Sequence, residues 1–513
     1  MNDSRPLCKY GAGCYQKNPL HKAKYKHPEV TKMLPTKEFQ PIVETQSNAD
    51  PGSVDDPSTS RDRASQEEDV GPPRKKIKTN TNKTNASSAQ MKRFAHRLQH
   101  CSMYRIFLNK IFSLEATRHD NNALVFPDLL SPSLGELIET AQFNFLVDLE
   151  YLHQNYDGCG VANLPLLLVY GEMEGCQALF PNATYKKVVM PYLYGTHHTK
   201  MMLLHYTTGL RVVVHTANLR PDDWYEKTQG FWVSPLFPKL QKEDACEGDS
   251  CTRFRADLLA YLRCYKLTDV NRWCDLLLQH DFSSCTFAHR LQHCSMYRIF
   301  LNKIFSLEAT RHDNNALVFP DLLSPSLGEL IETAQLPQTG ATNSCRVQVR
   351  VVYPSEEDVQ HSTQGWGGGS CLPYSSSTHS RQPWLQPHLC RWRSSPFGRT
   401  AAMPHIKTYC RYNDALHTAQ YLLLTSANLS KAAWGALQKQ GSQLFIRSYE
   451  AGVLLLPHYL AGEDSFSLAG DPRATTLPLP YDLPLVPYSA SCVPWLSDTR
   501  KTVKDVLGRA YRV

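Results

Sequence analysis

Apolar positions divide the chain into a polar N-terminal stretch and a patterned remainder. From about Glu29 to Lys92, Ser, Thr, Asn, Asp, Lys and Pro dominate, and there is almost no periodic apolar pattern. Such a stretch cannot bury enough apolar surface to offset the entropy lost on ordering. We therefore expect residues 29–92 to form a disordered linker.

In the remainder, β-rich runs alternate with helical patterns. Val347–Tyr353, Tyr421–Thr425 and Gly452–Leu456 are short β-rich runs, whereas Leu429–Gln440 has a helical pattern. This alternation predicts an α/β fold. The C-terminal stretch ATTLPLPYDLPLVPYSASCVPW is too rich in proline for regular elements. We expect it to wrap the surface as extended chain.

Two apolar runs, about two hundred residues apart, are framed by the same polar residues. One reads GTHHTKMMLLHYTTGLRVVVHTANL, and the other reads MPHIKTYCRYNDALHTAQYLLLTSANL. In each, a His and a Lys two residues apart precede a strand-like run, so both side chains point to one side of the strand. A second β-rich run then leads to an asparagine. The pattern predicts two hairpin-like units that each present three polar side chains: His198, Lys200 and Asn218 in the first, and His405, Lys407 and Asn428 in the second.

These residue types suit chemistry at phosphorus. A neutral histidine can attack phosphorus and a protonated one can give its proton to a leaving group, while lysine and asparagine donate to phosphoryl oxygens that gain charge. Ser430 stands where a helix begins, a place that favours a phosphate oxygen. No acidic cluster accompanies either motif, so we expect the two lysines to replace Mg²⁺ and catalysis to need no cofactor. A single H-x-K arises by chance in many chains, but two copies, each followed by [ST]-A-N-L, indicate a site.

At these residues the chain resembles the tyrosyl-DNA phosphodiesterase family of the phospholipase D superfamily. The segments GGGSCLPYS, LLLTSANLSKAAWGALQKQGSQLFIRSYEAGVLLLP and LPLPYDLP also carry the resemblance. Phospholipases of the superfamily have H-x-K-x4-D, but His205 and Tyr412 occupy the aspartate positions here. Tyrosyl-DNA phosphodiesterases show the same departure, which argues against a lipid hydrolase. The resemblance implies two pseudosymmetric phospholipase D-like α/β halves that share one active site.

The resemblance also implies a role for each site residue. His198 would be the nucleophile that forms a phosphohistidine, and His405 the acid that protonates the leaving tyrosine and then the base that activates water. Gln229 in EKTQG and Glu450 in RSYEAG would orient the histidines across the halves. The alternative for Glu450 is a plain surface carboxylate, and we prefer the role that the resemblance implies. The side chains that would hold the phosphate are Lys200, Lys407, Asn218, Asn428 and Ser430.

The N-terminal segment RPLCKYGAGCYQKNPLHKAKYKHP has zinc-ligand spacing. Two thiolates and two imidazoles make a closed tetrahedral site, and in so short a segment the metal must supply the folding energy. The alternative is four unligated residues in a disordered tail. The segment resembles the poly(ADP-ribose)-binding zinc finger, which implies aromatic stacking on adenine, although Gln16 stands where that family often has Arg. The expected zinc ligands are Cys8, Cys14, His21 and His27, and the stacking residues are Tyr10 and Tyr15.

One segment occurs twice without a single difference. Phe94–Gln142 returns as Phe287–Gln335, 193 residues downstream. Solenoid repeats diverge and stack without a long gap, so this is no solenoid. A recent segmental duplication and an error in assembling the coding sequence both remain open. The second copy stands where the family has a further strand, a helix and a serine-bearing DNA-binding segment, and we expect it to be the less well packed copy.

Together these patterns divide the chain into five parts: a zinc finger (1–28), a basic linker (29–92), an N-terminal half (93–285), the duplicated segment (286–336) and a C-terminal half (337–513). The linker contains PPRKKIK, which reads either as a nuclear import signal or as a solvated charge run. The net charge of +7 mildly favours a polyanionic partner. The start MNDSRPLCKY lacks a signal-peptide core and no apolar run is long enough to span a bilayer. We expect free thiols, and the nucleus as the location with the cytoplasm left open.

The function that the resemblance implies is repair of DNA ends. The enzyme would hydrolyse 3′-phosphotyrosyl and related 3′ adducts on single- and double-stranded DNA, releasing a peptide derived from topoisomerase I, as a monomer recruited by poly(ADP-ribose). Two alternatives remain at this point. One is a catalytically impaired poly(ADP-ribose) reader, if the rearranged middle prevents the halves from assembling. The other is a phospholipase D-like lipase or general nuclease that uses the same His-Lys pairs.

Overall fold

The computed structural model describes residues 94–241, 248–285, 299–300, 348–438, 443–470 and 476–512. All of them belong to one compact unit, Ile42–Val513. The finger, the linker and nearly all of the second repeat copy lie outside the described residues, so the predictions made for those parts stay predictions. Within the described ranges, no helix combines the length and apolarity needed to cross a membrane. The described cysteines are free thiols.

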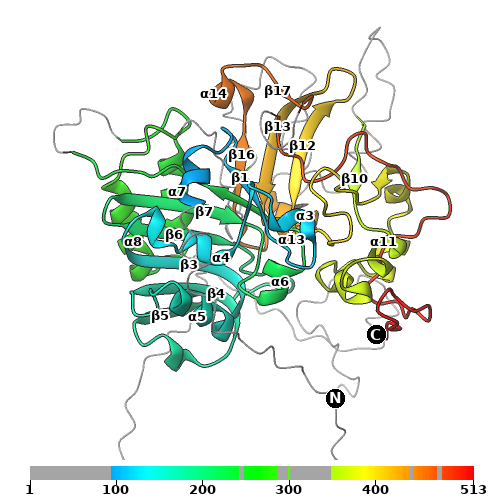
Figure 1. The fold of residues 1–513 in the computed structure, drawn as a ribbon, viewed down its shortest axis with the longest axis horizontal. Coiled ribbons are helices and arrows are strands. Elements are labelled where there is room, and N and C mark those ends of the chain that lie inside the picture. The colour runs from blue at the N-terminus through cyan, green and yellow to red at the C-terminus, as the bar shows by residue number, and fades with distance from the viewer. Residues whose placement is uncertain are drawn as a thin grey trace, which may run out of the picture. The chain divides into compact units, whose positions relative to one another are not determined.

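The N-terminal half is built on an eight-stranded sheet in the order β2-β1-β8-β7-β6-β3-β4-β5 (Figure 1). Its outer pairs β1–β2, β3–β4 and β4–β5 are parallel, whereas the central pairs are antiparallel. The strands are β1 (Ile106–Asn109), β2 (Ala123–Leu124), β3 (Leu137–Asp148), β4 (Leu166–Glu174), β5 (Ala183–Lys187), β6 (Met201–Tyr206), β7 (Gly209–His215) and β8 (Gly230–Val233).

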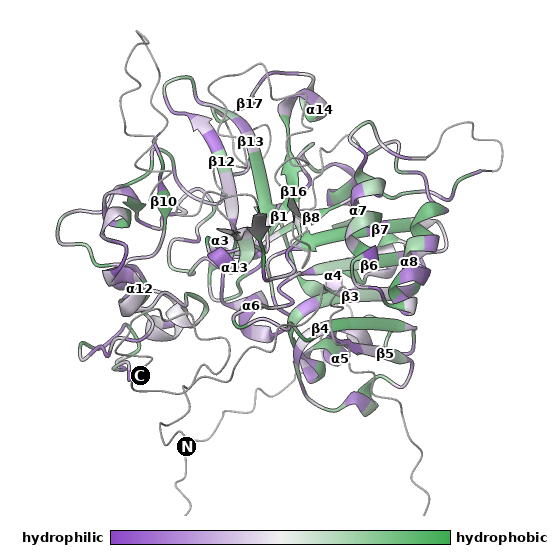
Figure 2. Ribbon diagram, turned by 180° about the vertical axis from the view of Figure 1, so that it is seen from behind, coloured by the Kyte–Doolittle hydropathy of each residue, from purple (hydrophilic) through white to green (hydrophobic). Residues whose placement is uncertain are grey.

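Helices cover both faces of this sheet, which is why its central strands are apolar on both sides. The four residues Met201–Leu204 of β6 are all fully buried, as expected for a strand between two packed layers. Figure 2 shows these strands as continuous apolar ribbons. The covering helices are α4 (Phe126–Leu129), α5 (Leu149–Gly158), α6 (Pro221–Tyr225), α7 (Phe254–Arg263) and α8 (Thr268–Leu278). This half also contains the short helix α3 (Glu115–Arg118) and 3₁₀ turns at Pro132–Leu134 and Gln177–Leu179.

A tight turn joins β6 to β7 and requires glycine. Gly209 has φ +148°, and a Cβ added there would lie 2.3 Å from the carbonyl oxygen of Phe237. Any side chain would therefore push β7 away from the neighbouring segment. The glycine thus fixes the hairpin that delivers the first His-Lys-Asn set.

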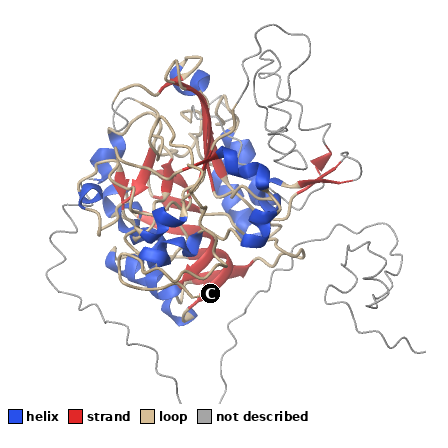
Figure 3. Ribbon diagram, turned by 90° about the vertical axis from the view of Figure 1, so that its right-hand side faces the viewer, coloured by secondary structure: helices blue, strands red, loops and turns tan. Residues whose placement is uncertain are grey.

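The C-terminal half has a smaller sheet, in which β12, β13 and β16 are neighbours and β17 also pairs with β13. Short helices and long loops surround it (Figure 3). Its strands are β10 (Val351–Val352), β11 (Leu389–Cys390), β12 (Thr408–Asn413), β13 (Thr418–Thr425), β14 (Ala436–Gln438), β15 (Gln443–Phe445), β16 (Gly452–Leu455) and β17 (Phe466–Ser467). Its helices are α11 (Glu356–Gln360), α12 (Ser376–Ser380), α13 (Lys431–Trp434) and α14 (Pro457–Ala461), with 3₁₀ turns at Gly365–Cys371 and Pro383–His388.

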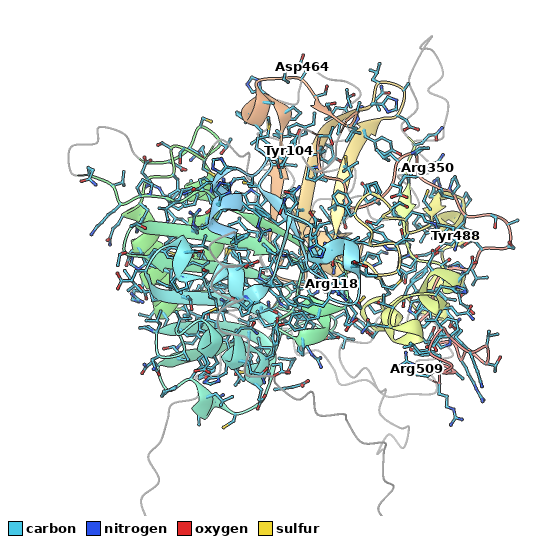
Figure 4. The ribbon with its side chains drawn as sticks, in the orientation of Figure 1. Tyr104, Arg118, Arg350, Asp464, Tyr488 and Arg509 are labelled. Atoms are coloured by element: carbon cyan, nitrogen blue, oxygen red, sulfur yellow. The ribbon has the colours of Figure 1, made fainter. Side chains whose placement is uncertain are left out.

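One hydrophobic core joins the two halves. It combines Trp232 of β8 and Phe254 of α7 with Leu424 of β13 and Val453 of β16, all of them buried. Tyr104, labelled in Figure 4, packs its ring edge-on against Phe466 of β17 at 5.2 Å. A contact layer of this kind excludes water from the seam. The rearranged middle of the sequence therefore does not keep the halves apart.

Two secondary-structure predictions need correction. The helical pattern predicted over Leu429–Gln440 gives only the four-residue α13, because Gly435 with φ +95° ends it and the chain continues as strand β14. The β-rich run Val347–Tyr353 forms only the two-residue β10. The proline-rich C-terminal stretch is confirmed as irregular chain, since residues 476–512 contain only turns, bends and isolated bridges.

The first repeat copy is an integral part of the N-terminal half. Its apolar residues Phe94, Leu98, Phe107 and Leu129 are buried in the core on one face of the large sheet. In this copy, Ile106 and Phe107 pair with Trp232 and Phe231 of β8. The same dipeptide in the second copy forms β9 (Ile299–Phe300), which pairs with β15 instead.

Candidate active site

Two hairpins deliver the six motif residues, as the sequence predicts. His198 and Lys200 directly precede β6, and Asn218 comes three residues after β7 ends at His215. In the second hairpin, His405 and Lys407 directly precede β12, and Asn428 comes three residues after β13 ends at Thr425. Both strand pairs are antiparallel. The two motifs thus have the same local geometry in halves of different size.

Each histidine is held by the other half of the molecule. The backbone N–H of His198 donates to the carbonyl oxygen of Tyr449 at 2.9 Å, and its Nδ1 lies 2.9 Å from Oε2 of Glu450. The backbone N–H of His405 donates to the carbonyl oxygen of Thr228 at 2.9 Å. Its Nδ1 lies 3.0 Å from the amide nitrogen of Gln229. The predicted orienting residues therefore contact their histidines across the seam.

The two lysines and two hydroxyl residues continue this symmetry. Nζ of Lys200 donates to the carbonyl oxygen of His198 at 2.8 Å, and Nζ of Lys407 to that of His405 at 2.6 Å. The hydroxyl of Thr216 donates to Gln229 at 2.7 Å, and that of Ser426 donates to Glu450 at 2.5 Å. The first residue of [ST]-A-N-L therefore supplies a hydroxyl in both halves. Thr216 holds Gln229, which contacts His405, and Ser426 holds Glu450, which contacts His198.

Asp223 breaks the symmetry, and sequence reasoning missed it. Its Oδ2 lies 3.3 Å from Nδ1 of His405, and it accepts from the backbone and side-chain N–H groups of Asn218 at 2.6 and 2.9 Å. When TANLRPDDW is aligned with SANLSKAAW, Ala433 stands opposite Asp223. That comparison of the two motifs was the signal that could have found it.

The asparagine positions also differ between the halves. Asn218 is 5% exposed and held by Asp223, whereas Asn428 is exposed. Ser430, the predicted helix start, is confirmed as the N-cap of α13, where its Oγ accepts from the N–H of Ala433 at 3.3 Å. An exposed amide and an exposed hydroxyl remain accessible to a phosphate that arrives from solvent.

Burial keeps both imidazoles neutral. It lowers the pKa of His198, and the Lys200 and Lys407 charges lower it further while Glu450 opposes the shift. Burial, with the Lys407 charge, lowers the pKa of His405 to about 4, although Asp223 opposes this shift. Among the described residues, neither ring has a hydrogen-bond partner at Nε2. Each histidine therefore holds Nδ1 against a fixed partner and keeps Nε2 for chemistry.

The two lysines form a centre of positive charge, in which each raises the cost of charging the other. Burial, with the neighbouring Lys407, lowers the pKa of Lys200 to about 7. Burial lowers the pKa of Lys407 to about 8. Burial alone would raise the pKa of Glu450, but the nearby His198 and the hydrogen bonds it accepts hold that pKa below its usual value. A bound phosphate would stabilise both ammonium groups, so the site is complementary to an anion.

An aromatic side chain that the sequence did not single out lies against this centre. The ring of Phe145 is 5.5 Å from the His198 ring, and Nζ of Lys200 lies 5.5 Å from its centroid. Gly171 makes room for it, because a Cβ there would lie 2.8 Å from the Phe145 ring. Phe145 restricts the space around both first-half residues. Phe145 lies within β3, where no motif in the sequence marks it.

The family profile for tyrosyl-DNA phosphodiesterase matches residues 105–291 and 300–489. The chain belongs to the tyrosyl-DNA phosphodiesterase family. The second match begins inside the second repeat copy, earlier than the motifs themselves indicate. A separate profile, the PBZ domain, matches residues 5–29 and coincides with the zinc finger predicted at 1–28. The family membership and the finger are thus confirmed.

Curated tyrosyl-DNA phosphodiesterases match most of the chain. Tyrosyl-DNA phosphodiesterase 1 of Drosophila melanogaster is 32% identical, over 96% of this chain and 99% of its own length. The probable tyrosyl-DNA phosphodiesterase of Caenorhabditis elegans is 35% identical over 72% of this chain and 84% of its own. A crystal structure of yeast tyrosyl-DNA phosphodiesterase matches with a TM-score of 0.58 at 19% identity, covering 76% of this chain and 99% of that one. This last likeness confirms the α/β fold.

The two positions where phospholipases have aspartate lie in the strands of the hairpins. His205 of β6 places its Nδ1 3.1 Å from Oε1 of Glu139, which also pairs with Arg272. Tyr412 of β12 is half-buried and packs against the shared core. Both residues therefore have structural contacts in the folded protein. The departure from the phospholipase motif is accommodated without a carboxylate in either place.

Proposed function

We propose that this chain is a DNA-repair phosphodiesterase that hydrolyses the 3′-phosphotyrosyl bond between DNA and a topoisomerase I-derived peptide, and related 3′ adducts. The observation that carries the proposal is the crossed pair of histidines. Each ring is fixed through Nδ1 by a residue of the other half, His198 by Glu450 and His405 by Gln229. Two oriented imidazoles beside buried Lys200 and half-buried Lys407 suit a double displacement at phosphorus. Membership of the tyrosyl-DNA phosphodiesterase family supports the same reaction.

In the first step, Nε2 of His198 attacks phosphorus. A P–N bond forms, the bond from phosphorus to the tyrosine oxygen breaks, and the proton on Nε2 of His405 passes to that oxygen. Glu450 accepts from Nδ1–H of His198 and stabilises the positive charge that develops on the ring. The low pKa of His198 keeps it unprotonated and able to attack.

In the second step, water replaces the histidine. Nε2 of His405, now neutral, takes a proton from water while the water oxygen attacks phosphorus. The P–N bond breaks, which releases a 3′-phosphate and restores His198. Lys200 and Lys407 stabilise the phosphoryl oxygens in both steps, aided by Asn218, Asn428 and Ser430, so catalysis requires no metal ion.

The bound phosphodiester also explains how His405 can act as an acid. In the free site, burial and the Lys407 charge lower the pKa of His405 to about 4. A phosphate anion placed between the lysines offsets their charge and raises that pKa. Protonated His405 is therefore favoured in the complex with substrate.

For the finger, we propose zinc held by Cys8, Cys14, His21 and His27. Two thiolates and two imidazoles are a donor set that suits tetrahedral zinc, which would order the segment. Tyr10 and Tyr15 would stack on adenine of poly(ADP-ribose). The finger would bring a monomeric enzyme to damaged DNA in the nucleus, a location that the basic segment PPRKKIK also favours.

Turnover of defined substrates tests the proposal. The protein should release tyrosine from a single- or double-stranded oligonucleotide with a 3′-phosphotyrosyl end, at an unchanged rate in EDTA, and should leave phosphatidylcholine vesicles intact. A protein that binds poly(ADP-ribose) but leaves the oligonucleotide uncut would be a reader. One that hydrolyses the lipid, or that cuts unmodified DNA internally, would be a lipase or general nuclease. Strict Mg²⁺ dependence would contradict the proposed role of the lysines.

A further inference from the structure

A single buried asparagine of β1 contacts the segment that holds both ring partners of His405. The Nδ2 of Asn109 donates to the carbonyl oxygens of Trp224 and Lys227 at 2.8 and 2.7 Å. Its Oδ1 accepts from the backbone N–H of Gln229 at 2.9 Å. Asn109 is fully buried. Its side chain therefore uses both donors and its acceptor on the stretch from residue 224 to 229.

The slightly longer segment from Asp223 to Gln229 carries both side chains that contact the His405 ring. Asp223 begins it and lies 3.3 Å from Nδ1 of His405, and Gln229 ends it. A shift of the segment would move both contacts together. Geometry within a few tenths of an ångström matters here, because a displaced imidazole no longer delivers its proton along the required line.

Arg399 contacts the same asparagine from the other half. Its guanidinium donates to the backbone oxygen of Asn109 at 2.5 Å and lies 3.4 Å from Oδ1. Arg399 is fully buried and stands six residues before His405. The segment between them is fixed to the first half as well, because the Thr228 backbone N–H donates to the oxygen of Met403 at 2.9 Å.

We propose that Asn109 and Arg399 are positioning residues for His405, so that protonation of the leaving group and activation of water depend on them. Through Asn109, these two residues connect the segment that precedes His405 with the segment that carries Asp223 and Gln229. The corresponding contact of His198 with Glu450 does not involve either residue. The inference rests on the proposed function, because it assigns them to the acid–base half of that reaction.

The two steps can be separated by the leaving group. 4-Nitrophenolate leaves without protonation, whereas tyrosine needs His405 as its acid. In Arg399→Lys and Asn109→Asp, thymidine 3′-(4-nitrophenyl phosphate) should still give a burst of nitrophenol at a rate within about twofold of wild type. The steady state that follows should be at least about tenfold slower, because water activation fails. The covalent phosphohistidine adduct should then accumulate on denaturing gels, and tyrosine release from the 3′-phosphotyrosyl oligonucleotide should fall by a similar factor.

Two control variants test ordinary destabilisation. Asn155→Ala removes another buried asparagine, whose Nδ2 donates to the oxygen of Tyr151 within α5. Arg105→Lys removes a guanidinium that donates to the backbone oxygens of Val233 and Ser234 at the other end of β8. Neither control should show a burst followed by a slow phase. Thermal melts of all four variants report the folded fraction.

Equal loss of burst and steady state in both test variants, without adduct, would assign Asn109 and Arg399 a purely structural role and overturn the proposal. Wild-type kinetics in both variants would overturn it as well. If the wild-type protein leaves the 3′-phosphotyrosyl oligonucleotide intact, the proposed function fails and this proposal fails with it. If the wild type is active and only the burst pattern is missing, the positioning proposal alone is wrong.

Discussion

His198 and His405 have similar backbone contacts, but the side chains around their rings differ in charge. Each histidine donates its backbone N–H to a carbonyl oxygen of the opposite half, and its ring is contacted by side chains of that half. Yet the Nδ1 of His198 contacts the carboxylate of Glu450 at 2.9 Å, whereas the Nδ1 of His405 contacts the neutral amide of Gln229 at 3.0 Å. The carboxylate of Asp223 lies farther away, 3.3 Å from Nδ1 of His405. Two halves with similar backbones can therefore give their two histidines different acid–base properties. The difference matches the division between a nucleophile and an acid–base.

The largest effect should come from removing each ring in turn. His198→Ala should lower turnover on the order of 10³-fold or more, because no other group attacks phosphorus. His405→Asn should also be slow, but it should accumulate a covalent adduct, since attack can occur while hydrolysis lacks its base. Denaturing gels of enzyme incubated with labelled 3′-phosphotyrosyl DNA measure this. An adduct in His198→Ala and none in His405→Asn would reverse the two assigned roles.

Removing the charge difference should have the next largest effect. Glu450→Gln gives both histidines a neutral amide partner, and we expect kcat to fall about 10²-fold or more because the developing imidazolium loses its carboxylate. The measurement is steady-state kinetics with KM determined separately. Ser426→Ala is the matched control, since it removes only the hydroxyl that donates to Glu450, and it should cost far less. Equal loss in the two variants would show that orientation alone matters.

The opposite exchange should change the pH dependence. In Gln229→Glu a carboxylate lies beside His405, which should raise the pKa of that histidine by about one unit or more. The acid must be protonated, so activity should persist to higher pH than in wild type. In the wild type itself, the basic limb of kcat should lie above that of kcat/KM, because the phosphate anion raises the pKa of His405 from about 4. Identical profiles for kcat and kcat/KM would contradict that explanation.

The smallest effect should come from the finger. Cys14→Ala should abolish binding of poly(ADP-ribose), because the zinc site loses a ligand. Cleavage of a short oligonucleotide should stay within about twofold of wild type, since the described contacts of His198 and His405 all come from the two halves. Filter binding and turnover of the same preparation measure both quantities. Loss of cleavage would mean that the finger belongs to the catalytic fold.

The sequence predicted the site well because its motifs are local and occur twice. His198, Lys200 and the strand that follows them are contiguous, and so are His405, Lys407 and β12. The hairpins and the α/β class were therefore expected. The crossed contacts of Gln229 and Glu450 were expected from the family resemblance and not from a local motif. The direction of a side chain next to a strand can be predicted from the sequence, because the strand geometry fixes which way successive side chains point.

What the sequence did not predict depends on distance along the chain or on single backbone angles. Asn109 contacts Gln229 120 residues away and Arg399 290 residues away, and nothing near Asn109 in the sequence signals either partner. The helix predicted over Leu429–Gln440 ended early because Gly435 adopts φ +95°. Asp223 could have been found by comparing the two motifs, but its contact with His405 needs the assembled halves.

The contact between His198 and Glu450 joins the two halves, so it also determines when during synthesis His198 can be oriented. His198 and its carboxylate partner Glu450 are 252 residues apart. At about 5–20 residues per second, a ribosome needs roughly 10–50 s to make the second residue after the first. Throughout that interval the nascent chain carries a histidine that is neither buried by the second half nor oriented. The proposed nucleophile is therefore oriented only when synthesis is nearly complete, and a chain interrupted before Glu450 lacks the carboxylate that orients His198.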